Sequence, residues 1–158
     1  MFQQETHEDF VVRADATLSE LDQLWISKQR GTHIPARTDF TIRDLKAYLR
    51  NIVFVTVEIP NEQDSPLRIT FAGDTVIQLM GQQTGKLVSE FFSPPLATRF
   101  AGAFSEVRTV RRPCRFIYRL EFSNRPFIES RTLIAPLSSD GIQISGFMAA
   151  VFFGHAAK

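Results

Sequence analysis

The chain is poor in the residues that most often carry covalent or metal chemistry. Its 158 residues include one cysteine and three histidines. A single cysteine excludes an internal disulfide and a cysteine-rich zinc site, and it is typical of a reducing compartment. The histidines, His7, His33 and His155, all lie outside the stretch from Ile34 to Gly154. The body of the domain therefore offers no imidazole to a haem iron, and no nucleophile–base pair is evident.

The sequence also lacks a strong charge of one sign and a long apolar run. Its formal net charge is +1, so no broad basic surface is expected to hold nucleic acid. The longest uncharged apolar tract, GFMAAVFFG from Gly146, is about half a membrane span. The amino terminus, MFQQETHEDF, lacks the basic and apolar regions of a signal peptide. We expect a cytoplasmic protein that binds neither nucleic acid nor a membrane.

Phenylalanine is abundant instead, with 15 residues against one tryptophan and two tyrosines. A chain of this length forms one domain with a substantial core. Aromatic rings without polar groups suit a thick apolar core, and they also suit a pocket for an apolar molecule. Composition favours the core and leaves the pocket as the alternative.

Helical periodicity is confined to the first third of the chain and to one later segment. Residues 1–14 are polar and are predicted to form a flexible tail, and residues 15–50 are predicted to form two helices. The first helix is expected to begin at Asp15, because Leu18, Leu21 and Trp25 fall on one side of a helix from there. This stripe is too apolar to face water, so these three residues are expected to contact either the sheet or a partner. A homodimer through the N-terminal helices is one such arrangement.

The second helix is predicted to begin near Asp39 or Thr41, with Ile42 and Leu45 facing inward. Residues 52–59 are apolar on both faces, which predicts a central buried strand. Period-2 alternation predicts a second strand at 67–72, with Leu67, Ile69 and Phe71 on its buried face. Broken helix is expected from 75 to 110. Three further strands are predicted at 115–122, 127–135 and 142–153, joined by turns at 123–125 and 140–141.

The hairpin formed by the strands at 115 and 127 has a predicted register. Arg119 is expected opposite Glu129 on one face, with Phe116, Tyr118 and Leu120 together on the other face. A slip of one residue would turn the aromatic face outward, so this register should be strongly preferred.

Two strands, a helical crossover and a three-strand meander predict an α+β fold. Its core, residues 51–155, would be a five-stranded antiparallel sheet with the helical crossover on one face. The two N-terminal helices are additional to that core and would cover its other face or pair with a second copy.

Short motifs along nearly the whole chain occur in a characteristic order and spacing. They are Leu24-Trp25 with Lys28, Arg30 and Gly31; Ile34-Pro35-Ala36-Arg37; Asp44-Leu45 with Leu49 and Asn51; Arg68, Ala72-Gly73, Gly81 and Thr84-Gly85-Lys86; Pro136-Leu137-Ser138; and Asp140-Gly141. Together they resemble the single-domain PAS family found widely in alphaproteobacteria, of the PAS_5 type. The resemblance implies a sensory or scaffold module without catalytic activity, and it brings no assigned ligand.

We therefore predict a stand-alone PAS-like module that acts through contacts with a signalling protein. Its input, if there is one, would be a small apolar ligand between the sheet and the crossover helices. The pocket candidates are Phe71, Met80, Phe92, Phe104, Phe116 and Tyr118. No metal, haem or flavin cofactor is expected. Cys114 lies in a PCRF segment similar to the NCRFLQ motif of flavin light sensors, but the asparagine, leucine and glutamine of that motif are replaced.

Two other classes of protein remain as alternatives. One is a small enzyme of the hydratase or isomerase type, in which Asp74, Tyr118 and Glu129 are loose candidates for an acid or base in a Phe-lined cavity. The other is a purely structural dimerisation module whose core is filled.

Overall fold

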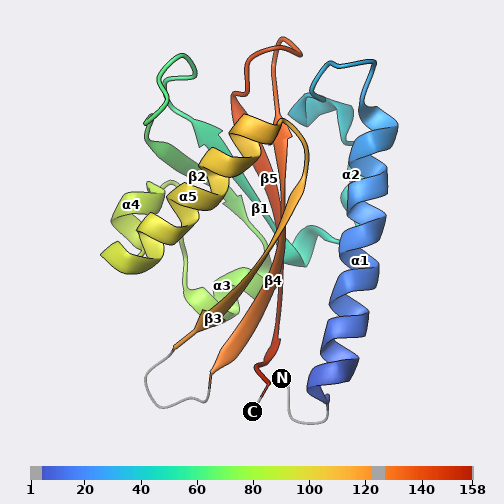
Figure 1. Ribbon diagram of the computed structural model, residues 1–158, viewed down its shortest axis with the longest axis vertical. Coiled ribbons are helices and arrows are strands. Elements are labelled where there is room, and N and C mark those ends of the chain that lie inside the picture. Colours follow the sequence, from blue (N-terminus) through green and yellow to red (C-terminus); the bar gives the residue numbers. More distant parts are fainter. Residues whose placement is uncertain (1–4, 122–126, 158) are drawn as a thin grey trace.

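The computed structural model describes residues 5–121 and 127–157, which form a five-stranded antiparallel sheet between two helical layers (Figure 1). The helices are α1 (His7–Lys28), α2 (Ile42–Leu45), α3 (Asp74–Met80), α4 (Val88–Phe91) and α5 (Pro94–Val110), with single 3₁₀ turns at Arg37–Asp39 and Leu49–Asn51. The strands are β1 (Ile52–Val57), β2 (Leu67–Ala72), β3 (Cys114–Leu120), β4 (Ile128–Leu137) and β5 (Gly146–His155).

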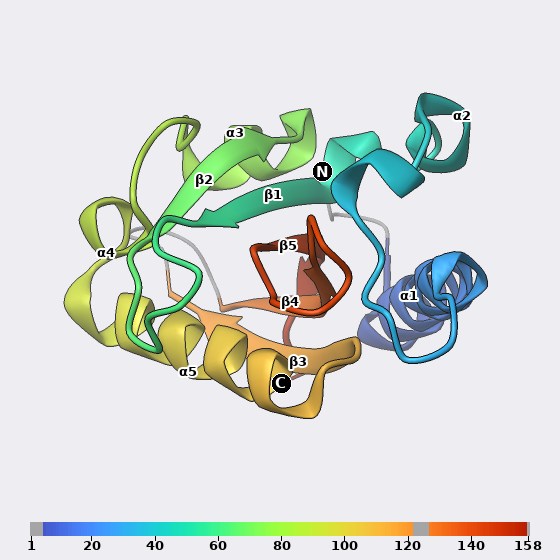
Figure 2. The ribbon, with the colours of Figure 1, turned by 90° about the horizontal axis from the view of Figure 1, so that it is seen from above.

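The strand order is β2-β1-β5-β4-β3, and every neighbouring pair is antiparallel. The chain thus forms two strands, crosses over through α3, α4 and α5, and returns as a three-strand meander. This arrangement confirms the predicted α+β fold. Viewed in two directions, α4 and α5 lie on one side of the sheet and α1 lies on the other (Figures 1 and 2).

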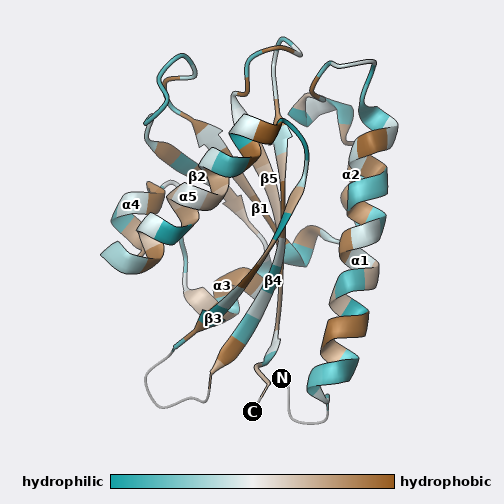
Figure 3. Cartoon of the chain, in the orientation of Figure 1, coloured by the Kyte–Doolittle hydropathy of each residue, from teal (hydrophilic) through white to brown (hydrophobic). Residues whose placement is uncertain are grey.

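The N-terminal helix is longer than the sequence predicted. It begins at His7 rather than Asp15, and the Thr6 hydroxyl accepts a hydrogen bond of 3.0 Å from the backbone N–H of Asp9. Phe10 and Ala14 are fully buried and extend the apolar stripe of the helix by two turns. The prediction of a flexible tail over 1–14 is therefore wrong from residue 7 onward. Alternating polar and apolar bands along α1 in Figure 3 reflect a helix with one buried side.

The second predicted helix is reduced to the single turn α2. Thr41 and Asp44 form the capping box that starts it, with hydrogen bonds of 3.1 and 2.9 Å. Leu45 is buried as expected, whereas Ile42 is 80% exposed and does not face inward. A helix of one turn has no continuous apolar side, which is why the periodic assignment failed at Ile42.

A β-bulge in the pairing of β1 with β2 reverses one prediction. Val55 pairs with Ile69 and Phe54 pairs with Phe71, so Thr70 is an extra residue on β2. Because side chains alternate along a strand, this extra residue turns Phe71 to the face opposite Ile69. Phe71 is 38% exposed and packs beside Phe54, with their ring centroids 6.1 Å apart. Phe71 is therefore not a pocket residue.

The predicted hairpin register is confirmed. In the pairing of β3 with β4, Arg119 stands opposite Glu129, and Tyr118 stands opposite Ser130. The turn predicted at 123–125 lies outside the described residues. At the second turn, Gly141 has a φ of 83°, and the Asp140 carboxylate accepts hydrogen bonds of 2.8 and 2.9 Å from the backbone N–H groups of Ile142 and Gln143.

Within residues 5–121 and 127–157, the structure contains no helix that is long and apolar enough to cross a membrane.

Candidate functional site

A cavity of about 60 Å³ lies between the sheet and the crossover helices. All five strands contribute to its wall, and α3, α4 and α5 or the segments beside them close it. The residues that line it are Val53, Val55, Ile69, Val76, Met80, Gln83, Val88, Phe92, Phe100, Phe104, Tyr118, Leu120, Ser130, Thr132, Ile134, Ala149, Val151 and Phe153.

Four of the six pocket candidates predicted from sequence line this cavity, namely Met80, Phe92, Phe104 and Tyr118. The other two do not. Phe116 is partly buried on the cavity side of β3 but lies outside the lining. Phe71 is turned to the opposite face by the bulge described above.

One wall of the cavity is a series of aromatic rings packed edge to face. The ring centroids of Phe92 and Phe100 are 4.7 Å apart, and those of Phe100 and Tyr118 are 5.3 Å apart. Offset and edge-on contacts of this kind place the positive rim of one ring against the negative face of the next. Burial raises the pKa of the Tyr118 phenol, although the nearby Arg99 guanidinium opposes the shift. Tyr118 therefore stays a neutral hydroxyl at the edge of an apolar space.

Gln83 is the residue that sequence reasoning missed. Its side chain lines the cavity with 2% of the residue exposed. Among the described residues, its amide nitrogen Nε2 is the one buried side-chain nitrogen or oxygen without a hydrogen-bond partner. Leaving a buried donor unpaired costs about 1–3 kcal/mol, a penalty that leucine at this position would avoid.

The backbone around Gln83 is fixed by hydrogen bonds to β2. The N–H of Gly85 donates to the Ile69 carbonyl at 2.7 Å, and the N–H of Ile69 donates to the Lys86 carbonyl at 2.9 Å. Gly81 and Gly85 have φ angles of 96° and 86°, which only glycine adopts readily. Gly81 and Gly85 thus shape a loop that follows the edge strand and turns Gln83 inward.

The cavity is too small for a flavin or a haem. Its volume of about 60 Å³ is well below the roughly 150 Å³ of a cavity that holds one benzene. A three-ring flavin or a haem is several times larger than benzene. Cys114 is outside the lining, and burial raises the pKa of its thiol, so the reactive thiolate is disfavoured. Nor do the described residues gather three or more metal-binding side chains in one place.

The predicted interface residues Leu18, Leu21 and Trp25 lie on the opposite side of the sheet. All three are fully buried where α1 packs against β4 and β5. The indole N–H of Trp25 donates a buried hydrogen bond of 2.9 Å to the Pro136 carbonyl. Of the two arrangements predicted for this stripe, the structure shows packing against the chain's own sheet, so the stripe is not exposed to a partner.

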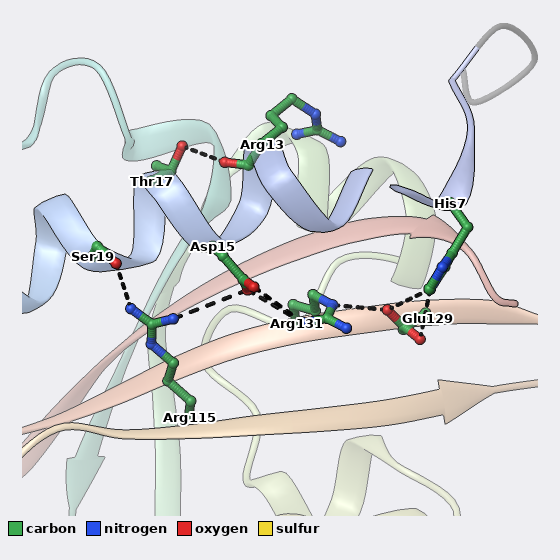
Figure 4. A network of polar contacts seen from close by, with 8 residues as sticks. All are labelled: His7, Arg13, Asp15, Thr17, Ser19, Arg115, Glu129 and Arg131. Atoms are coloured by element: carbon green, nitrogen blue, oxygen red, sulfur yellow. Dashed lines mark hydrogen bonds and ion pairs between the residues drawn. The ribbon is translucent and has the colours of Figure 1, made fainter. Parts of the chain in front are cut away.

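A polar network also joins α1 to the sheet (Figure 4). Arg131 on β4 donates to the Glu129 carboxylate at 2.8 Å and contacts Asp15 of α1 at 3.2 Å. His7 at the start of α1 lies 3.2 Å from the same Glu129 carboxylate. Glu129 thus bonds to His7 and Arg131, while Arg119 across the strand pair donates to the Ala157 carbonyl at 2.9 Å.

The candidates for an enzymatic acid or base are not brought together. Tyr118 faces the cavity, whereas Glu129 belongs to the network on the other side of the sheet. Asp74 is exposed in the first turn of α3. These three side chains therefore form no shared catalytic site in the described part of the chain.

The strand order, the helical crossover and the cavity beneath it are those of a PAS domain. The family model for the PAS domain, PAS_5, matches residues 13–149, which is most of the chain. The chain belongs to this family. A comparison with curated proteins finds no match.

Solved structures with the same fold include the PAS domain of BvgS from Bordetella pertussis. It is 13% identical to this chain with a TM-score of 0.52, and the match covers 74% of this chain and 87% of that one. A light-oxygen-voltage domain studied with a flavin analogue is 14% identical with a TM-score of 0.50, and the match covers 71% and 82% of the two chains. At these identities the likeness shows the fold.

Proposed function

We propose that this PAS domain is a sensory or scaffold module that acts through contacts with other proteins, and that the cavity is its input site for a small apolar ligand. The observation that carries the proposal is the cavity itself. It lies between the sheet and the crossover helices, its wall is almost wholly apolar, and it contains no charged side chain among the described residues. Burial of apolar surface is the driving force that such a space offers to a ligand.

The cavity and the polar network on the far side of the sheet share one strand, which supports a sensory role. Ser130 and Thr132 of β4 line the cavity, while Glu129 and Arg131, which alternate with them along the strand, bond to His7 and Asp15 of α1. A ligand that moved β4 would therefore act on residues that hold the N-terminal helix.

Native mass spectrometry of freshly purified protein tests the proposal. We expect a small molecule to remain bound to the wild-type chain and to be absent from Ala149→Leu, whose larger side chain fills the cavity. Val12→Leu, at a position 70% exposed on α1, is the matched control and should keep the ligand. An unliganded wild-type mass, together with no change in stability when apolar compounds are added, would contradict the proposal and favour a filled structural core.

A further inference from the structure

We infer that the cavity selects a neutral small molecule that carries a carbonyl-type hydrogen-bond acceptor, and that the Nε2 amide of Gln83 recognises this acceptor. The inference rests on the proposed function, because it specifies the ligand of the same cavity. It starts from the buried Nε2 of Gln83, which lacks a partner within the residues that the structure describes.

The inward position of Gln83 is built into the chain. Its own carbonyl accepts a hydrogen bond of 3.1 Å from the N–H of Lys86, and the loop that follows pairs with Ile69 of β2. The guanidinium of Arg68 further fixes this loop through a 2.8 Å hydrogen bond to the Gly85 carbonyl. The neighbouring Gln82 is exposed, and its side chain accepts a hydrogen bond from the backbone of Thr84. The side chain of Gln82 is thus held at the surface, and the side chain of Gln83 is held in the cavity.

The lining decides the charge of the ligand. None of the residues around the cavity is Lys, Arg, His, Asp or Glu. A carboxylate or an ammonium group would therefore be desolvated without a counter-ion, which is strongly unfavourable. The matching groups are ketones, aldehydes, esters and other uncharged carbonyl compounds, whose acceptor oxygen suits the amide donor of Gln83.

The volume decides the size of the ligand. A cavity of about 60 Å³ is smaller than a core cavity of roughly 150 Å³ that binds one benzene molecule. The fit is to a compound of a few carbon atoms. Met80 and Leu120 line both this cavity and an open groove of about 450 Å³ beside it. Methionine is unbranched and flexible, so its movement gives a route from the groove into the cavity.

The inference can be tested with two probes of the same shape. Butanone carries the acceptor oxygen, and 2-methylbut-1-ene replaces that oxygen by a methylene group. Binding to the ¹⁵N-labelled full chain is followed by two-dimensional NMR, using the side-chain amide resonances of Gln83. We expect butanone to bind about tenfold more tightly than the alkene, which is the typical effect of one neutral hydrogen bond. The Gln83 amide protons should shift only with butanone.

Variants separate recognition by Gln83 from general apolar binding. In Gln83→Leu the preference for butanone should disappear, while the matched surface variant Gln63→Leu should keep it. Gln83→Met, which has a similar length and no donor, serves as a second version of the same test.

Equal binding of both probes to the wild-type chain would overturn this inference and leave the cavity as an apolar ligand site. Binding of neither probe, with a long-lived water bonded to the Gln83 amide, would overturn both this inference and the proposed ligand.

Discussion

Replacement of Trp25 measures how far the domain depends on α1. Its indole is 1% exposed between α1 and the sheet, and its N–H donates to the Pro136 carbonyl at 2.9 Å. Trp25→Ala removes the largest fully buried side chain and should cost about 3–5 kcal/mol of unfolding free energy. Trp25→Phe keeps most of the apolar contact but leaves the Pro136 carbonyl without its donor, so it should cost about 1–3 kcal/mol.

Urea unfolding followed by circular dichroism gives these values directly. Val12→Ala, on the exposed side of the same helix, is the control and should change the free energy by no more than about 0.5 kcal/mol. The slope of the free energy against urea should be unchanged if only the folded state is affected. A cost below about 1 kcal/mol for Trp25→Ala would refute the reasoning, because the packing of α1 on the sheet would then contribute little.

The same residue also reports whether α1 unfolds with the sheet. Trp25 is the only tryptophan in the chain, so its fluorescence monitors the contact between α1 and β4. We expect the fluorescence and circular dichroism transitions of the wild-type chain to coincide. A fluorescence transition at lower urea would instead show that α1 separates from the sheet before the rest of the domain unfolds.

Three further predictions concern other parts of the structure. An added Cβ at Gly154 would overlap the ring of Phe10, so Gly154→Ala should destabilise the domain by about 1–3 kcal/mol, and less in a Phe10→Ala background. Arg131→Met removes a hydrogen bond from the buried Glu129 carboxylate and should cost about 1–3 kcal/mol in urea unfolding, whereas Glu129→Gln with Arg131→Met should recover part of it. Backbone N–H groups lower the pKa of Asp140 below its usual value. The contribution of Asp140 to stability should therefore be complete above about pH 4 and should be lost as the pH falls through the lower pKa of the folded state. Asp140→Asn should weaken this pH dependence, and an NMR titration that gave an ordinary pKa for Asp140 would contradict the prediction.

The sheet could be predicted from sequence because each strand carries its own signal. Alternation along β3 and β4 places Tyr118 and Ser130 on one face and Arg119 and Glu129 on the other, and the pairing follows from that alternation. The bulge at Thr70 could not be predicted in the same way. The extra residue gives β2 no distinctive sequence pattern, so only the pairing of β2 with β1 reveals the bulge.

The site was less predictable than the sheet. Four aromatic or apolar lining residues were found because large apolar side chains on the inner elements of a small domain have few other places to go. Gln83 could not be found, because a polar residue in a loop gives no periodic signal, and its burial depends on the hydrogen bonds between that loop and β2. The start of α1 was a different case. Phe10 and Ala14 continue the spacing of Leu18 on the same side of a helix, and the surrounding polar residues concealed that signal.

The position of β4 inside the sheet, between the cavity and α1, couples the two layers of this domain. Along its sequence Ile128–Leu137, side chains alternate between the cavity and α1, so Ser130 and Thr132 line the cavity while Glu129 and Arg131 bond to residues of the N-terminal helix. β4 is also hydrogen-bonded on both sides, to β3 and β5, and therefore has no free edge along which to adjust. A shift of the strand that enlarged the cavity would displace the carboxylate and guanidinium groups on its other face by a similar distance. Because hydrogen bonds weaken steeply with distance and misalignment, the network at α1 is sensitive to displacements far smaller than a change of register.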